Sequence, residues 1–407
     1  MKNEKVQHFA ALSFSRYKKS LCGIIDNVQG KKDMSIKSDP HNLITAKEFK
    51  TLIKTNVEAI LKDPKVAHAL PPIMCWGSPG VGKSSVVKEV AKELGIDFID
   101  VRLAQMEPCD IKGLPVPDDT TKTMNWYVNG SWPTDKNGKG ILFLDELSSC
   151  DRSVAVAAYE LILDRRLGKL YKVPDGYYIV GAGNLTTDRA VATTMSSALA
   201  NRFMHVEIQA DPDVWLEWGR INDIHPSVLG YIGYKPDSLF NMEGEVLDRG
   251  WPSPRAWERV SQVVRLWASN EEMMRKSVYG LVGPAKGIEF MAFHKLNKKF
   301  DNVLDIMYGK VPFVFPAKND EKHALCSTLI YLLWKATDDI DQKKRLDGFF
   351  KMTMEMTSDF AAMCMIGAMN GNGLKPKDFC TKALYNHELF KDWREVHGNA
   401  LKKRYMK

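Results

Sequence analysis

Short apolar runs alternate with amphipathic stretches in the first half of the chain. Between about residues 42 and 210, stretches such as 84–94 and 153–163 carry apolar side chains at helical spacing. Strands that alternate with helices in this way indicate βαβ units and a mainly parallel sheet. The expected strands are 73–76, 98–102, 141–144, 178–182 and 205–208.

Strand-like runs stop near residue 212, and helical patterns follow. We therefore predict an α/β fold in which a parallel sheet flanked by helices is followed by all-α units. A polar, basic N-terminal arm is predicted to lie outside the sheet. The expected later helices are 214–221, 254–268, 271–278, 324–337 and 347–369. The predicted units are 1–40, 41–210, 211–310 and 311–407.

The composition is that of an ordinary globular protein. Charged residues make up 26% and hydrophobic residues 44% of the chain, which excludes disordered, collagenous and coiled-coil classes. No apolar stretch approaches the roughly 18 residues of a membrane helix, so we expect no membrane partner and no secretory signal. The 7 cysteines include no CxxC pair, which argues against disulfides and zinc and favours a cytoplasmic location.

The segment 77–84 matches the pattern GxxxxGK[ST], which binds phosphates. Glycines let the backbone approach the phosphates, and the N–H groups of a helix N-terminus attract negative charge. Lys83 is expected to reach the β- and γ-phosphates, and the Ser84 hydroxyl to bind Mg²⁺. We therefore expect ATP as the ligand. The candidate nucleotide-binding residues are Gly77, Ser78, Pro79, Gly80, Val81, Gly82, Lys83, Ser84, Ser85 and Asp145.

Polar side chains follow two of the expected strands. Asp145 and Glu146 come directly after an apolar run, where Asp145 would join Ser84 in binding Mg²⁺ and Glu146 would polarise a water for attack on the γ-phosphate. Asn184 ends the next strand and either positions the same water or caps a loop. The 9 histidines show no metal-ligand spacing, so no metal other than Mg²⁺ is expected.

These motifs, followed by the segments 200–203 and 251–255, occur in the order of an AAA+ ATPase, and the pattern resembles the MoxR and dynein-related branch. The resemblance covers about residues 45–300. It implies a P-loop fold with a sensor asparagine at Asn184, an arginine finger at Arg202 and a sensor arginine at Arg255. Arg255 would lie at the start of a helix of a helical lid. Asn201 stands where that branch more usually has an aspartate.

The resemblance also implies an assembly and a role. Members form homo-oligomeric rings, usually hexameric, with ATP at each boundary, so Arg202 would reach the γ-phosphate bound by a neighbouring subunit. A protein client would be remodelled or matured, together with a von Willebrand factor A domain partner. The net charge of +7 leaves an ATP-driven DNA or RNA motor as the alternative, although no nucleic-acid module is recognisable. A nucleotide-gated scaffold is a third alternative.

Three further segments allow more than one interpretation. Residues 108–115 resemble an insert of that branch, and 166–177 resemble its β-hairpin before the sensor strand. The hairpin is either a grip for a polymer or a solvated turn, and the methionine-rich stretch 352–369 is either the core of the C-terminal helices or a partner groove. Trp251 and Trp257 are expected to pack the lid onto the nucleotide domain. The residues of the candidate grip are Arg165, Arg166, Lys169, Tyr171 and Lys172.

Overall fold

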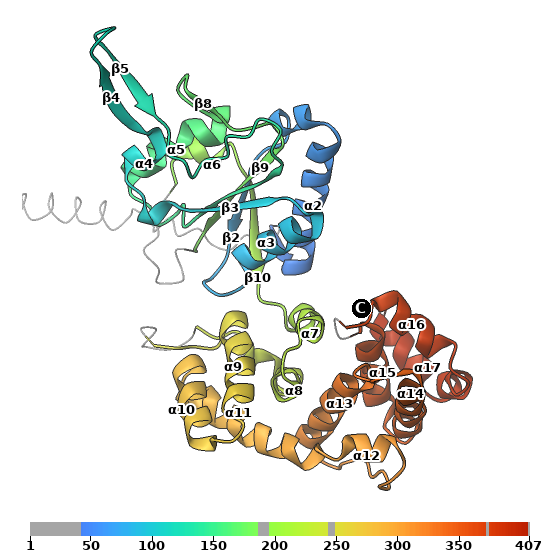
Figure 1. Cartoon of the computed structure of the whole chain (residues 1–407). Coiled ribbons are helices and arrows are strands. Elements are labelled where there is room, and N and C mark those ends of the chain that lie inside the picture. Colours follow the sequence, from blue (N-terminus) through green and yellow to red (C-terminus); the bar gives the residue numbers. More distant parts are fainter. Residues whose placement is uncertain (1–41, 186–194, 243–248, 372–373, 406–407) are drawn as a thin grey trace, which may run out of the picture.

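A six-stranded parallel sheet forms the centre of the N-terminal half in the computed structural model, which describes residues 42–185, 195–242, 249–371 and 374–405 (Figure 1). The strand order is β1-β10-β2-β9-β6-β3, with every neighbouring pair parallel. The predicted α/β fold is therefore confirmed. The strands are β1 (Leu43–Thr45), β2 (Ile73–Trp76), β3 (Asp97–Arg102), β6 (Gly140–Asp145), β9 (Tyr177–Gly183) and β10 (Met204–Gln209).

Helices cover both faces of this sheet, and a hydrophobic cluster lies on each side. α2 begins at a capping box made by Thr45 and Glu48 and packs with α3 over one face. α5 packs over the other face. Because both faces are buried, β6 and β9 consist almost entirely of apolar or small residues. The helices of this half are α2 (Ala46–Lys62), η1 (Pro64–His68), α3 (Lys83–Leu94), α5 (Arg152–Asp164) and α6 (Ser197–Ala200).

Two antiparallel hairpins leave the sheet. The first follows η2 (Leu103–Gln105) and α4 (Pro108–Lys112); it consists of β4 (Leu114–Asp118) and β5 (Thr123–Tyr127) and projects away from the body of the molecule (Figure 1). The sequence did not predict these strands. The second hairpin, β7 (Arg166–Leu167) with β8 (Tyr171–Lys172), lies where the family resemblance placed one.

A helical bundle follows the sheet, and its core surrounds Trp257. The indole is fully buried against Tyr231 and Phe290 and donates a hydrogen bond to the Ser238 carbonyl at 2.7 Å. The expectation that Trp257 packs the bundle onto the nucleotide domain is wrong, because its whole side chain lies inside the bundle. The elements are α7 (Pro212–Ile221), α8 (Pro226–Tyr234), η4 (Pro236–Ser238), α9 (Pro254–Leu266), α10 (Glu271–Val282), α11 (Pro284–Asn297) and η5 (Lys298–Phe300); α12 (Val303–Met307) comes next and packs into the core of the last helices.

The last helices share a second apolar core, and α13 also packs against α8. The single helix expected over 347–369 is wrong: the chain breaks at 355–357, where Thr357 adopts an extended conformation before a new helix begins. Met352, Met356, Met365 and Met369 are buried, which favours the core interpretation of this stretch. The helices are α13 (Asn319–Leu333), α14 (Asp339–Met354), α15 (Ser358–Met369), α16 (Lys377–Tyr385) and α17 (Phe390–Tyr405).

Among the residues that the structure describes, no helix has both the length and the apolar character needed to cross a membrane.

Candidate nucleotide site

The phosphate-binding loop joins the end of β2 to the start of α3. Gly80 and Gly82 have φ of +82° and +105°, in the left-handed region that favours glycine. A Cβ on Gly80 would also lie 2.9 Å from the Ser253 hydroxyl of the helical bundle. The first turn of α3 contains no acidic residue. The positive end of this helix is therefore left for an anion.

Lys83 connects the loop to the end of the sensor strand. Its ammonium donates hydrogen bonds to the carbonyls of Gly77 and Ser78, the latter at 3.2 Å, and to the Asn184 Oδ1 at 3.0 Å. These neutral acceptors bind an ammonium less strongly than a phosphate oxygen does, because hydrogen bonds between two charged groups are stronger. A phosphate in the loop can therefore replace them as the partner of the lysine.

The two acids and Asn184 meet at the same edge because β6 and β9 are parallel neighbours. The Leu147 N–H donates to the Ala182 carbonyl at 2.9 Å, and the Asn184 N–H donates to the Ser148 hydroxyl at 3.0 Å. These two bonds tie the turn after β6 to the end of β9. Glu146 lies in this turn with a φ of +58°, a strained conformation of the kind that clusters at functional sites.

The edge of the sheet also collects negative charge. Burial raises the pKa of Asp100 on β3, and the charge of Asp145 acts in the same direction. A divalent cation bound by Asp145 would reverse that second effect. Asp100 was not among the candidate residues, since no local motif distinguishes it from other strand aspartates.

The first turn of α9 lies directly on the phosphate loop. Ser253 caps this helix by accepting a hydrogen bond from the Ala256 N–H, and the Arg255 N–H donates to the Gly80 carbonyl at 3.2 Å. The Arg255 side chain is exposed beside the loop and lines the cavity described below. The structure therefore brings Arg255, the sensor arginine that the family resemblance implies, together with the loop.

Arg202 lies at the other edge of the sheet, where the parallel strands begin, and not at the edge where they end and the phosphate loop starts. It precedes β10, whose first residue, Met204, pairs with Ile73, the first residue of β2. The phosphate loop begins only after the other end of β2, about 13 Å further along at the usual strand rise. Arg202 is exposed and lines a separate cavity of about 310 Å³. The chain does not bring this arginine to its own phosphate loop.

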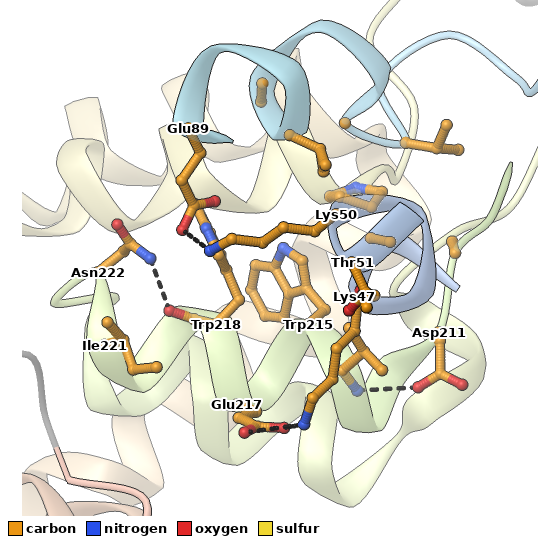
Figure 2. A pocket seen from close by; sticks show the side chains of 18 of the residues that line it. Lys47, Lys50, Thr51, Glu89, Asp211, Trp215, Glu217, Trp218, Ile221 and Asn222 are labelled. Atoms are coloured by element: carbon orange, nitrogen blue, oxygen red, sulfur yellow. Dashed lines mark hydrogen bonds and ion pairs between the residues drawn. The ribbon is translucent and has the colours of Figure 1, made fainter. Parts of the chain in front are cut away.

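A larger cavity of about 530 Å³ opens beside the loop, between α2, α3, α7 and α9. Figure 2 shows Trp215 and Trp218 of α7 lying near Lys50 of α2. The ring centroids of the two tryptophans are 6.4 Å apart. The cavity has the size and aromatic lining typical of small-molecule sites. Sequence reasoning missed these tryptophans, although their spacing of three residues in an amphipathic helix places both on one face.

Ion pairs frame this cavity. Lys47 of α2 pairs with Glu217 of α7 at 3.0 Å, so the sheet domain and the bundle are joined across it (Figure 2). Lys50 contacts both Glu89 and Glu93 of α3 at 2.7 Å. Burial lowers the pKa of Lys50, but hydrogen bonds and charge interactions with the two glutamates outweigh it, so the net pKa is raised. The ammonium therefore stays charged across the neutral range.

The β7–β8 hairpin differs from the expected grip. Arg165 is buried and donates hydrogen bonds to the carbonyls of Pro174 and Tyr177 at 3.0 and 2.7 Å, and burial lowers its pKa. Tyr171 is also buried, and its hydroxyl donates to the Pro133 carbonyl at 3.0 Å. Both side chains support the hairpin from inside and cannot contact a polymer. The exposed cations are Arg166, Lys169 and Lys172.

Comparisons with known proteins agree with this geometry. Residues 73–206 match the family described as "ATPase family associated with various cellular activities (AAA)". The chain is 27% identical over 195 residues to midasin of Giardia intestinalis; the match covers 45% of this chain and 4% of midasin, so the chain spans a small part of that relative.

Solved structures that match the chain include a point mutant of Thermotoga maritima RuvB, with 16% identity, a TM-score of 0.37 and coverage of 70% of this chain and 83% of RuvB. NtrX from Brucella abortus has 14% identity, a TM-score of 0.34 and coverage of 84% and 71%. The family match on 73–206 contains the phosphate loop, both acids and Asn184. Residues 73–206 therefore match an AAA ATPase domain.

Proposed function

We propose that Mg²⁺ and ATP bind at the edge formed by the phosphate loop, β6 and β9. Lys83 and the loop N–H groups contact the phosphates, and the base enters the cavity beside Trp215 and Trp218. Ser84 and Asp145 supply oxygen ligands of the kind that Mg²⁺ prefers. No cluster of three metal-ligating side chains occurs in the part of the chain that the structure describes. This fits a cation that takes its remaining ligands from phosphate and water.

The chemistry assigned to this site is attack of water on the γ-phosphate. Glu146 polarises the water, and Asn184 orients it. Lys83 and Arg255 offset the negative charge that spreads over the phosphate oxygens in the transition state. The support for these roles is the shared position of the side chains at one edge of the sheet, with Arg255 held over the loop by the first turn of α9.

The chain works as a homo-oligomeric ring, with Arg202 completing the site of the neighbouring subunit; a hexamer is the expected size. The observation that carries this proposal is the position of Arg202 at the edge of the sheet opposite the loop. A head-to-tail contact brings opposite edges of two copies together, and repetition of that contact closes a ring. Residues 41–210 then serve as the nucleotide domain and 211–310 as its lid.

The ring couples ATP hydrolysis to the remodelling or maturation of a protein client, together with a von Willebrand factor A domain partner. The motif order similar to the MoxR and dynein-related branch and the similarity to midasin support this role. A DNA or RNA motor is the alternative, and DNA-stimulated ATPase activity that falls with salt would select it.

The test is a Glu146→Gln variant of the full chain, with Glu355→Gln, an exposed glutamate between α14 and α15, as control. Glu146→Gln should bind ATP normally and lose about 10²–10⁴-fold in turnover, while the control hydrolyses ATP like the wild type. Crosslinking of the ATP-loaded variant to candidate domains identifies the partner. Wild-type turnover by Glu146→Gln would refute the assigned chemistry.

A further inference from the structure

The β4–β5 hairpin is exposed along almost its whole length. Every residue of both strands is exposed except Asp118, which is intermediate. An isolated two-stranded hairpin is marginally stable in water, and soluble proteins rarely expose contiguous apolar surface. The hairpin therefore has the character of an interaction element. Its large apolar side chains and their exposed fractions are Leu114 (61%), Val116 (41%), Met124 (59%), Trp126 (42%) and Tyr127 (66%).

Both ends of this hairpin are held in place. At the base, Gly113 has a φ of +93°, and a Cβ there would lie 2.2 Å from the Tyr127 carbonyl oxygen, so only glycine fits. The Asn129 side chain donates to the Asp110 carbonyl at 3.2 Å. At the tip, Asp118 accepts a hydrogen bond from the Thr120 N–H at 2.9 Å. The hairpin is thus a defined arm that begins at a tight junction with α4.

The two edges of the hairpin are chemically different. Pro115 lies opposite Trp126, and Pro117 lies opposite Met124. Proline has no N–H, so these must be the pairs that exchange no hydrogen bonds. The N–H and C=O groups of Met124 and Trp126 therefore point away from β4, along the outer edge of β5. The outer edge of β4 lacks donors at both prolines, so only β5 offers a continuous row of donors and acceptors.

We propose that β5 binds an extended, apolar polypeptide segment as a third strand of the hairpin, and that the segment belongs to the client; this last point rests on the proposed function. A row of alternating N–H and C=O groups is satisfied by another backbone in the extended conformation. The side chains of the added segment would alternate between the face of Tyr127 and the face of Trp126.

The charge of the two strands argues against nucleic acid as the ligand of the hairpin. Neither strand contains a lysine or arginine, and the charged residue that they do contain is Asp118. Binding of nucleic acid depends on cations that neutralise phosphates. An uncharged, apolar edge with a free backbone ladder fits an unfolded or extended stretch of protein.

The direct test is amide hydrogen exchange at single-residue resolution in the full chain, with reduced and carboxymethylated α-lactalbumin as an unfolded polypeptide probe. The N–H groups of Met124 and Trp126 should exchange freely in the protein alone and slow by at least about tenfold when the probe is bound. The Asn125 N–H, which already pairs with β4, should change less. Probe binding without protection of Met124 and Trp126 would overturn the proposal, as would protection that depends on protein concentration alone, which indicates pairing between copies.

Two variants separate the backbone edge from the side chain. Met124→Pro removes the outward N–H and mirrors Pro117 on the opposite strand, whereas Met124→Thr keeps the N–H and a strand-compatible side chain. Slow exchange at Asn125 shows that the hairpin is intact in each variant. The Kd for the probe should rise about tenfold in Met124→Pro and less than about threefold in Met124→Thr. Equal affinity of the two variants would overturn the proposal.

These binding measurements need no ATP turnover. A chain that fails to remodel any client but still protects Met124 and Trp126 with the probe would refute the proposed function and leave the third-strand site standing. A chain with client-dependent ATPase activity and no protection of Met124 and Trp126 would refute the third-strand site and leave the proposed function standing.

Discussion

Arg202 offers the sharpest test of the assembly, because its position separates two mechanisms. β10 begins at Met204, level with Ile73, and the phosphate loop starts at the far end of β2. The separation of about 13 Å along the strand exceeds the reach of an arginine side chain. Arg202→Ala should therefore leave ATP binding by the same subunit unchanged. It should also slow turnover by about 10³–10⁵-fold, the range measured for arginines that act across an interface.

Mixing two inactive variants gives a quantitative test of this geometry. In a mixed ring, a boundary is active when an Arg202→Ala subunit binds ATP and a Lys83→Ala subunit supplies the arginine. At equal amounts and with random assembly, about one quarter of head-to-tail boundaries meet both conditions. Specific activity should therefore rise to about a quarter of the wild-type value at equal amounts and fall symmetrically on either side.

The assay is steady-state phosphate release across a series of mixing ratios, with differently tagged subunits to verify that they exchange. Arg275→Ala is the matched control, since this exposed arginine lies on α10 and contacts Tyr279; its activity should match the wild type. Arg202→Lys should recover little, because an ammonium lacks the planar fork of a guanidinium. Exchange of subunits without recovery at any ratio would refute action across the boundary.

Two further predictions concern packing and pH. In Gly183→Ala the new Cβ would lie 2.7 Å from the Met74 Cε and 2.9 Å from the Ser148 hydroxyl. The free energy of unfolding in urea should fall by about 1–3 kcal/mol, and turnover should fall because Ser148 holds the Asn184 backbone. The control is Gly130→Ala, because the space around Gly130 is open. Equal stability of the two variants would contradict the packing argument. Burial and the charge of Lys298 lower the pKa of His294 from 6.5 to about 4. The unfolded chain then binds a proton that the folded chain does not, so this stability is present above pH 6.5 and is lost as the pH falls toward 4. Between pH 7 and pH 5 the wild type should lose about 2 kcal/mol more than His294→Gln, and an identical pH dependence would show that the imidazole is not involved.

Much of the nucleotide site could be predicted from the sequence because its signals are local. The loop glycines and Lys83 follow one another directly, and the two acids end an apolar run long enough to be a buried strand. Parallel strands meet at one edge, so Asn184 could be placed beside the acids from its strand alone. The strain at Glu146 could not be predicted, because nothing in the residue types indicates that this glutamate adopts a left-handed backbone conformation.

Other features depend on contacts between distant segments. Lys47 and Glu217 are 170 residues apart in the chain, and the cavity beside Trp215 and Trp218 exists only where α2 and α7 come together. The three residues of β1 are too few to show a strand pattern, and their pairing with β10 alone defines them. Arg165 and Tyr171 read as a basic, aromatic turn in the sequence, yet packing buries both.

The sequence by itself determined the parallel sheet, the phosphate loop and the acids beside it, because each depends on residue order within a few turns or one strand. The tertiary structure alone decided which edge of the sheet Arg202 occupies, that Arg255 rests on the loop, and that β4 and β5 form a free arm. Those outcomes depend on which strands pair and which apolar faces find a partner. Residue order within a short segment does not contain that information.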